Sequence, residues 1–357
     1  RVRKNASKVS EIALRNNVVL RPHIKTHKCA EVAKIATEKH SGAVTTSTLA
    51  EVWAFSKHGF NDFTYAMPIE SGKFSEAIEI VKSGVKLNLL TDDLETMKEL
   101  NETAKKGEVE INVFLKIDCG YHRVGIEPHS PEAFEIPKFI NEASNLKFAG
   151  ILTHAGHSYH AHSVAEIAEI AGQERDVMVA HAEKLRDLGV DVPCVSIGST
   201  PTINHVDHLR GIDEVRPGNY IFFDAFQATL GSCGFEDCAL TVLAAVTHRN
   251  RKTKKIVVDA GAIALSKDRG PVEFDKNCGY GRVLDLDGKE LGLRIDSLSQ
   301  EHGTFFVQDE ETFNRLKVGS RIRILANHSC LASAQHELFN VFENGEIVDQ
   351  WKIHPGW

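Results

Sequence analysis

The feature that most constrains the fold is a regular alternation over about the first 245 of 357 residues. Short apolar segments rich in β-branched residues alternate with amphipathic segments, which predicts parallel strands joined by crossover helices. Helical spacing of apolar residues marks the segments 49–58, 75–83, 92–105 and 164–188. Strands are predicted at 18–24, 43–46, 62–67, 86–90, 111–117, 148–153, 194–197 and 214–216. Eight such units predict a closed (β/α)8 TIM-type barrel.

The pattern changes after about residue 245. Strand-like segments then follow one another with turns between them, at 240–248, 255–259, 303–307, 321–325 and 338–342. We therefore predict an α/β chain in which a (β/α)8 barrel, residues 1–245, precedes a smaller β-rich domain, residues 246–357.

Composition narrows the classes of partner. The net charge of -7 offers no basic field for nucleic acid, and no apolar run reaches the roughly 20 residues that span a bilayer. We expect a small-molecule ligand and no nucleic-acid or membrane partner. Seven scattered cysteines favour reduced thiols, and the N-terminus, which begins at Arg1, lacks the apolar segment of a signal peptide. A cytoplasmic location is the expectation.

Polar residues follow the predicted strands at the end where such barrels place their active sites. Lys25 follows the first strand and Arg123 the fifth. Tyr159 follows the sixth, and the seventh and eighth are followed by Ser199, Thr200, Gly218 and Asn219. These groups are expected to converge on one mouth of the barrel.

Their chemistry suggests a cofactor. A Gly-Ser-Thr turn that opens a helix, with a Gly-Asn turn nearby, suits a phosphate held by backbone amides and hydroxyls. A lysine amine beside it can condense with an aldehyde. Pyridoxal phosphate meets both requirements. The residues alone leave open that Lys25 is an ordinary surface lysine, since Gly-Ser-Thr turns are common.

Several segments together resemble a known family. They are RPHIKTHK (21–28), KIDCGYHRVG (116–125), SIGST (196–200), EVRPGNYIFFD (214–224), VVDAGAIALSKDRG (257–270) and NHSC (327–330). In this order they are similar to the D-serine dehydratase and D-threonine aldolase family. That family is the metal-containing branch of the alanine racemase-like, fold type III pyridoxal phosphate enzymes.

The resemblance implies roles for the cofactor-binding residues. Lys25, the first lysine of RPHIKTHK, would bind pyridoxal phosphate, and Lys28 would be outward or structural. Arg123 would contact the phenolic oxygen of the cofactor, although an ion pair with Asp118 is the alternative. Arg216 matches an arginine that faces the pyridine nitrogen in racemases, and we leave it unassigned. The further implied cofactor contacts are Tyr159, Ser199, Thr200, Gly218 and Asn219.

His328 and Cys330 suggest a metal site. On an extended segment the two side chains would point the same way, and imidazole with thiolate suits zinc. Two residues are too few for a structural zinc site, and the sequence alone is also consistent with a core cysteine. The resemblance implies that this pair binds the zinc of the dehydratases.

The resemblance implies a D-serine dehydratase, also called D-serine ammonia-lyase, that forms pyruvate and ammonia by β-elimination. The Lys25 amine would remove the Cα proton of a small D-3-hydroxy amino acid, while zinc assists departure of the hydroxyl. A homodimer is implied by analogy. The alternatives are a metal-dependent D-threonine aldolase, a D-threo-3-hydroxyaspartate dehydratase, and a non-catalytic pyridoxal phosphate carrier.

Overall fold

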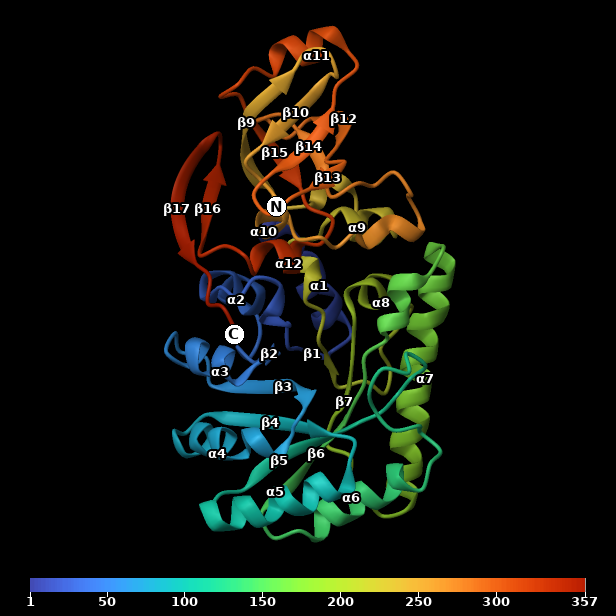
Figure 1. Ribbon diagram of the computed structural model, residues 1–357. Coiled ribbons are helices and arrows are strands. Elements are labelled where there is room, and N and C mark those ends of the chain that lie inside the picture. The colour runs from blue at the N-terminus through green and yellow to red at the C-terminus, as the bar shows by residue number, and fades with distance from the viewer. Residues whose placement is uncertain (357) are drawn as a thin grey trace. The chain divides into compact units, whose positions relative to one another are not determined.

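A computed structural model describes residues 1–356 and shows the alternation of strands and helices (Figure 1). Contacts divide the chain into two compact units. The barrel unit contains Ala6–Gly218 and the segment from His354, and the β unit contains Arg1–Asn5 and Asn219–Ile353. The boundary expected between residues 245 and 246 rests on the sequence pattern and stays a prediction. Residue 357, the end of the predicted second domain, lies outside the described residues.

Within the described residues, the barrel unit holds a parallel sheet of eight strands in the order β1-β8-β7-β6-β5-β4-β3-β2. The Thr45 backbone amide donates to the Pro22 carbonyl, and His23 forms an isolated parallel bridge with Thr45. The curled sheet thus closes into the predicted barrel. Its strands are β1 (Val19–Leu20), β2 (Val44–Thr46), β3 (Asp62–Pro68), β4 (Lys86–Thr91), β5 (Ile111–Lys116), β6 (Leu146–Leu152), β7 (Val195–Ile197) and β8 (Glu214–Val215).

The first strand is shorter than predicted. Its ladder partners in β8 are confined to Val19–Leu20, although the amides of Arg21 and His23 still donate to the carbonyls of Val215 and Pro217. The chain then forms a short 3-10 helix, η1 (Ile24–Thr26). Lys25 therefore lies on a turn rather than directly after the last residue of a strand.

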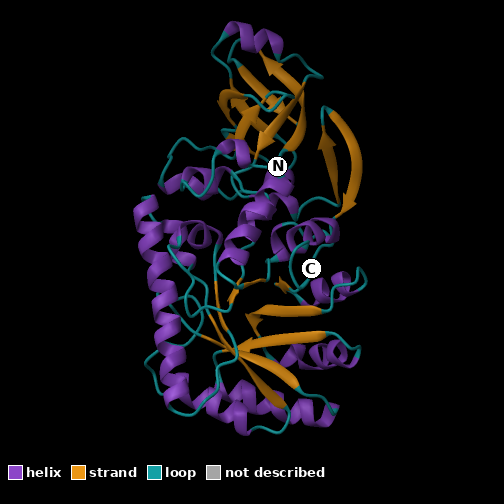
Figure 2. Cartoon of the chain, turned by 180° about the vertical axis from the view of Figure 1, so that it is seen from behind, coloured by secondary structure: helices purple, strands orange, loops and turns teal. Residues whose placement is uncertain are grey.

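Helices cover the outside of the barrel strands (Figure 2). Since side chains also fill the interior, β4 and β5 are buried on both faces, as parallel strands usually are. Among the described residues, none of the helices combines the length and apolarity needed to cross a membrane. The helices before residue 219 are α1 (Val2–Arg15), α2 (Ala30–Thr37), α3 (Leu49–Ser56), α4 (Phe74–Lys82), α5 (Leu94–Gly107), α6 (Glu132–Glu142), α7 (Val164–Asp187) and α8 (Thr200–His205).

Local sequence sets where these helices begin. Thr48 caps α3 through a capping box with Glu51, and Ser163 caps α7 by accepting from the Glu166 amide. Such caps satisfy backbone amides that have no partner within the helix. The predicted helical segments 49–58, 75–83, 92–105 and 164–188 coincide with α3, α4, α5 and α7.

The β unit is built on an antiparallel sheet in the order β12-β11-β15-β9-β10-β14-β13, with a separate hairpin β16-β17. Its core includes Val283, Phe305 and Ile324, all with side chains removed from solvent. The bounds are β9 (Val242–Asn250), β10 (Lys255–Val258), β11 (Arg282–Leu284), β12 (Glu290–Arg294), β13 (Ser297–Leu298), β14 (Gly303–Phe306), β15 (Arg321–Leu325), β16 (Leu338–Glu343), β17 (Glu346–Lys352), α9 (Ala225–Thr229), α10 (Ala262–Leu265), α11 (Glu310–Arg315) and α12 (Ser329–Ser333).

Candidate functional site

The turn that carries Lys25 is held from two sides. His23 caps η1, and its Nδ1 accepts a hydrogen bond of 3.4 Å from the Lys25 backbone amide. A Cβ at Gly218 would lie 3.0 Å from both the Cβ and the carbonyl oxygen of His23, so glycine lets the segment after β8 approach this turn. The Lys25 side chain is exposed at the end of the barrel where β1 finishes.

Lys28 has a different environment from Lys25. Its side chain is buried and forms an ion pair with Glu51, which is fully buried. The Glu51 carboxylate also accepts from the backbone amides of Ser47 and Thr48, at 2.7 and 3.3 Å. Lys28 adopts a left-handed backbone conformation, with φ of 49°. These contacts give Lys28 a structural role in the barrel unit.

Two histidines near Lys25 are kept neutral. Burial, followed by the charges of Lys25 and other nearby cations, holds the pKa of His23 well below its ordinary value. Burial and the charges of Lys116 and Lys25 do the same for His154. Burial and the neighbouring Arg216 also lower the pKa of Lys116 to about 7. Lys25, Lys116 and Arg216 act on the pKa values of these neighbours, so the three cations lie close together at this end of the barrel.

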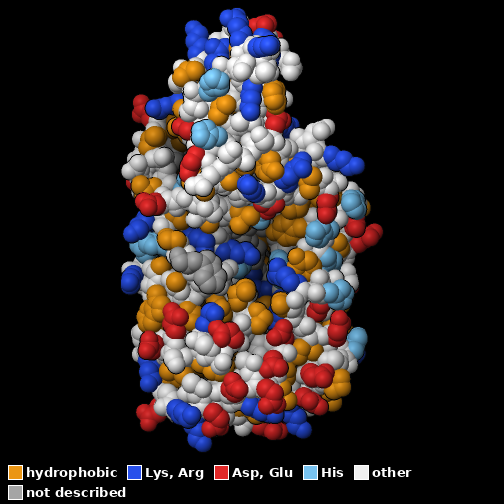
Figure 3. All heavy atoms as spheres, in the orientation of Figure 1, with side chains coloured by type: hydrophobic (Ala, Val, Ile, Leu, Met, Phe, Trp, Pro, Cys, Tyr) orange, Lys and Arg blue, Asp and Glu red, His pale blue; other side chains and the backbone are white. Residues whose placement is uncertain are grey.

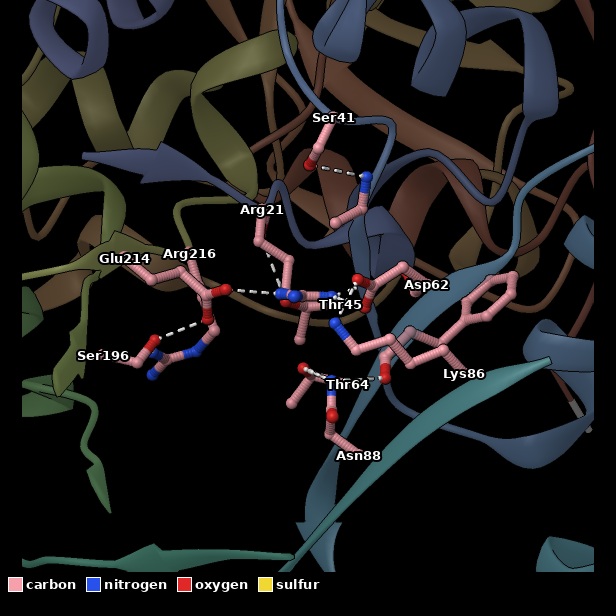
Figure 4. A network of polar contacts seen from close by, with 12 residues as sticks. Arg21, Ser41, Thr45, Asp62, Thr64, Lys86, Asn88, Ser196, Glu214 and Arg216 are labelled. Atoms are coloured by element: carbon pink, nitrogen blue, oxygen red, sulfur yellow. Dashed lines mark hydrogen bonds and ion pairs between the residues drawn. The ribbon is translucent and has the colours of Figure 1, made fainter. Parts of the chain in front are cut away.

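Arg216 belongs to a buried polar network (Figure 4). Its guanidinium donates to the Ser196 hydroxyl, which donates to Glu214 at 2.7 Å. The other Glu214 oxygen accepts from Arg21 at 2.6 Å, and Arg21 also pairs with Asp62 at 2.6 Å. Glu214 is therefore paired directly with Arg21, and the Ser196 hydroxyl links it to Arg216. Burial lowers the pKa of Arg216 from its ordinary value.

Two other carboxylates near the cations hold the backbone. One Asp118 oxygen accepts from the amides of residues 120–122, at 2.8, 2.9 and 3.1 Å. Glu174, which is fully buried, accepts from the amides of Ala155 and Gly198 at 3.0 and 3.1 Å. Both carboxylates keep their negative charge while they accept these bonds, so they offset part of the positive charge nearby and also shape the loops. The cations Lys25, Lys116 and Arg216 that lie close together here suit a ligand that carries phosphate or carboxylate groups.

The cluster of cations is local to the barrel end. The chain as a whole has a net charge of -7. In Figure 3, Asp and Glu side chains are spread over the part of the barrel unit where Figure 1 places α4 and α5. Positive charge at the barrel end is therefore a property of particular residues rather than of the overall composition.

Ser199 and Thr200 lie where β7 passes into α8. Ser199 is the N-cap of α8, forms a capping box with Thr202, and lies 3.1 Å from the Ser158 hydroxyl. Both Ser199 and Thr200 are buried. The preceding Gly198 has φ of 131°, and a Cβ there would lie 2.8 Å from the Arg216 backbone nitrogen. This glycine brings the end of β7 against the residue that follows β8.

Arg123 and Tyr159 complete the predicted set in the barrel unit. Arg123 is exposed, and its guanidinium lies over the Tyr121 ring at 4.9 Å from the ring centre. Asp118, the alternative partner considered for it, is 3.0 Å from His122 Nδ1. Tyr159 is half-buried in the short 3-10 helix η3 (Gly156–His160). Their roles toward a cofactor stay predictions.

Asn219 lies in the β unit, next to Asp224 and Cys330, whose side chains are of types that bind metals. Its amide nitrogen donates to Asp224 at 2.7 Å, to the Ser329 hydroxyl at 3.2 Å and to Cys330 Sγ at 3.6 Å. Its amide oxygen is buried and, among the described residues, has no hydrogen-bond partner. Asp224 also accepts from the Ser329 amide at 2.9 Å. These bonds hold the segment that contains Cys330, while the predicted phosphate contact of Asn219 stays a prediction.

His328 and Cys330 lie together with a carboxylate behind them. Nδ1 of His328 is 2.7 Å from Asp268 Oδ2. Burial opposes a charge on His328, but the side chains of Cys330 and Asp268 outweigh it and raise the pKa of the imidazole. The segment is not extended throughout as expected, because His328 is the last residue before α12 and Cys330 lies in the first turn of that helix. Imidazole, thiol and an orienting carboxylate form a donor set suited to zinc.

Sequence reasoning missed several residues of these clusters. Asp268 lies in the quoted segment 257–270, and Lys116 opens the quoted segment 116–125, so both could have been singled out there. Asp224 likewise ends the quoted segment 214–224. The structure also brings together Asp118, His122 and Glu127, with ligand atoms within 4.8 Å of one another, although His122 and Glu127 are exposed.

Comparison with known protein families gives two matches. The model for the N-terminal domain of alanine racemase matches residues 1–225. The model for the putative serine dehydratase domain matches residues 239–342.

Individual relatives match over the whole chain. D-serine dehydratase of Dictyostelium discoideum is 36% identical, with 100% of this chain and 94% of that protein covered. The solved structure of D-threo-3-hydroxyaspartate dehydratase from Delftia sp. HT23 is 32% identical with a TM-score of 0.96, and the match covers 100% and 95% of the two chains. Histidine-to-alanine and metal-free cysteine-to-alanine variants of a D-threo-3-hydroxyaspartate dehydratase match equally well, each with a TM-score of 0.96 and 31% identity. The chain belongs to the D-serine dehydratase family, and it joins an alanine racemase-like domain to a serine dehydratase domain.

Proposed function

We propose that this protein is a lyase, a D-serine dehydratase that depends on pyridoxal phosphate and zinc. The observation that carries the proposal is the presence, in one chain, of an exposed lysine beside a cationic cluster and of a His328–Cys330 pair backed by Asp268. The similarity to a D-serine dehydratase over the full length supports the choice of reaction.

The barrel unit fits the cofactor. Lys25 would hold the aldehyde group of pyridoxal phosphate, and the clustered cations would stabilise the phosphate and the carboxylate of an amino acid. Lys116, with its lowered pKa, gains most from a bound anion, since the anion would offset the cost of burying its charge. The remaining proposed contacts are Arg123, Tyr159, Ser199, Thr200, Gly218 and Asn219.

The β unit fits zinc. His328 and Cys330 would provide nitrogen and sulfur ligands and leave positions for substrate or water. In the solved dehydratase variants, the substituted histidine and cysteine lie two positions apart, as His328 and Cys330 do. The cysteine variant is described as metal-free. This spacing supports a zinc role for the same pair here.

Different residues of this chain would carry out different parts of the reaction. When bound, pyridoxal phosphate supplies an electron sink at Cα, and zinc supplies a Lewis acid for the β-hydroxyl. The Lys25 amine removes the Cα proton, and the cationic groups hold the substrate carboxylate. His23 and His154 stay neutral at neutral pH and add no further positive charge. Loss of water and hydrolysis of the product then convert D-serine into pyruvate and ammonia.

A substrate assay tests the proposal. Purified protein supplied with pyridoxal phosphate and zinc should release pyruvate and ammonia from D-serine and should leave L-serine unchanged, since one amine reaches only one face of Cα. Removing zinc with a chelator should stop pyruvate release, and adding zinc back should restore it. Comparable turnover of both enantiomers, or full activity without metal, would contradict this assignment.

The same assay separates the alternatives. A D-threonine aldolase would release glycine from D-threonine, and a D-threo-3-hydroxyaspartate dehydratase would prefer the substrate with a second carboxylate. The cluster of cations gives the latter some support, because a further carboxylate would be stabilised there. A pyridoxal phosphate carrier would bind the cofactor and release no product. It would have no use for the His328–Cys330 pair.

We infer further that the protein acts as a homodimer in the cytoplasm on a small D-3-hydroxy amino acid. The cysteines of the described residues are all free thiols, which suits a reducing compartment. Light scattering of the purified protein should give twice the chain mass if the dimer forms.

A further inference from the structure

The loop that contains Asp268 is built around its carboxylate. It follows α10, and it includes Ser266 with φ of 66° and Gly270 with φ of 31°. The Asp268 amide donates to the Ser266 hydroxyl at 3.1 Å, and the Gly270 amide donates to Asp268 Oδ1 at 2.7 Å. One carboxylate oxygen is therefore used to shape the loop.

The second oxygen faces a different segment. Asp268 Oδ2 is 2.7 Å from Nδ1 of His328, which is 60 residues away in the sequence. An ionised carboxylate only accepts hydrogen bonds, so this contact requires a hydrogen on Nδ1. In a neutral imidazole the lone pair then lies on Nε2, the other ring nitrogen.

We propose that Asp268 is a positioning residue for the metal-binding imidazole. It keeps the hydrogen of His328 on Nδ1 and fixes the ring, so that Nε2 is ready to bind zinc. The proposal rests on the proposed function, because it takes His328 as a zinc ligand. A carboxylate or carbonyl behind a metal-binding histidine typically changes metal affinity by about 10- to 100-fold.

The loop bond offers a way to separate positioning from simple structural support. In Asp268→Asn the amide oxygen can still accept from the Gly270 amide, so the loop keeps its shape. The amide nitrogen then faces His328 Nδ1 and donates to it, which favours the hydrogen on Nε2, where it blocks the metal. A purely structural Asp268 would tolerate this substitution, whereas a positioning Asp268 would not.

Asp275, which follows Asp268 in the sequence, provides a matched control. Asp275 Oδ1 accepts from the Asn277 amide at 2.9 Å, two residues further on, just as Asp268 does with Gly270. Asp275→Asn therefore makes the same chemical change on the same kind of turn, at a carboxylate whose described partner is that amide rather than His328.

The experiment measures zinc affinity directly, by competition with a chromophoric chelator, on the full-length protein. Asp268→Asn should bind zinc about 10- to 100-fold more weakly than the wild type, and Asp275→Asn should match the wild type within about twofold. Cobalt at saturating concentration should still give a thiolate charge-transfer band in Asp268→Asn, since Cys330 remains. Wild-type zinc affinity in Asp268→Asn would overturn the proposal, even if the variant unfolded at a lower temperature.

The ligand variants distinguish this failure from failure of the proposed function. If His328→Ala and Cys330→Ala lose zinc while Asp268→Asn keeps it, only the positioning role is wrong. If both ligand variants keep the affinity of the wild type, zinc binds elsewhere, and the positioning role falls with the proposed metal site.

Discussion

The two units carry polar clusters of opposite charge. In the barrel unit, Lys25, Lys116 and Arg216 lie near two neutral histidines, and the neighbouring carboxylates are occupied by backbone amides or by Arg21. In the β unit, Asp224, Asp268 and a thiol surround one imidazole. The sign of the fixed charge indicates the kind of ligand that each cluster would bind: the first cluster suits an organic anion and the second a metal cation.

Substitution of Lys25, in the cationic cluster, should have the largest effect on activity. Lys25→Ala should abolish the visible absorbance of bound pyridoxal phosphate and lower pyruvate formation by about 10³-fold or more, since acid–base catalysis alone contributes about 10²–10⁴-fold. Lys28→Met, whose native amine pairs with Glu51, should keep the absorbance. Absorbance that survived in Lys25→Ala after borohydride treatment would place the cofactor on another amine.

Loss of the Cys330 thiol should have the second-largest effect on activity, and it should affect only the cluster in the β unit. Cys330→Ala should lower pyruvate formation by about 10²–10³-fold, because Lewis-acid assistance contributes several kcal/mol. Absorbance of the cofactor should be unchanged. Exchange of the Cα hydrogen in deuterated water should also survive better than elimination, because the metal acts on the leaving hydroxyl. If exchange and elimination fell together, the metal would instead be needed for proton removal.

Much of the fold could be predicted because the alternation of strand and helix is local. The barrel strands were located to within a few residues, although β1 ends at Leu20 rather than near residue 24. In the β unit, the strands β11, β12, β13 and β17 were missed. These are short or highly exposed segments without a strong apolar pattern, since β17 has a single half-buried side chain and β13 spans two residues.

The two clusters differed in how far the sequence could reveal them. Residues after parallel barrel strands share one end of the barrel, so Lys25 could be placed from strand order. The partners of His328 lie in loops 60 or more residues away, and nothing in an antiparallel sheet predicts which loops meet. The quoted segments contain Asp268 and Asp224, but only the structure shows that these two carboxylates lie near His328.

The buried pair Lys28–Glu51 sharpens the distinction between structural and ligand-binding cations. Lys28→Met should lower the free energy of unfolding by about 3 kcal/mol, because it leaves the buried Glu51 carboxylate without its counter-ion. Urea unfolding would measure this. Lys73→Met, which removes the exposed partner of Glu70, should leave the unfolding free energy unchanged within error. Equal effects of the two substitutions would show that burial of the first pair has no energetic consequence.

The effect of Lys116 should be the smallest when it is taken per pH unit, and it takes the form of a pH dependence of stability. Its pKa is about 7 in the folded protein, below the ordinary value of 10.5, because burial opposes its charge. Between these pH values the unfolded chain binds more protons, so stability should rise with pH by at most about 1.4 kcal/mol per unit. Unfolding free energies of wild type minus Lys116→Met, measured without cofactor from pH 7 to 10, should show this slope. Inorganic phosphate should reduce it, and a flat difference would contradict a buried, unmatched cation.

Glu174 has a consequence for the evolution of new specificity. This one residue on α7 ties together the loops after β6 and β7, and it does so through the amides of Ala155 and Gly198 and the Thr202 hydroxyl at 2.9 Å. Because amides are common to almost all residues, side chains along the loop after β6 can change without loosening this anchor. A mutant library that randomises that loop but retains Glu174 should yield a high fraction of folded proteins, and with them a range of accepted amino acids.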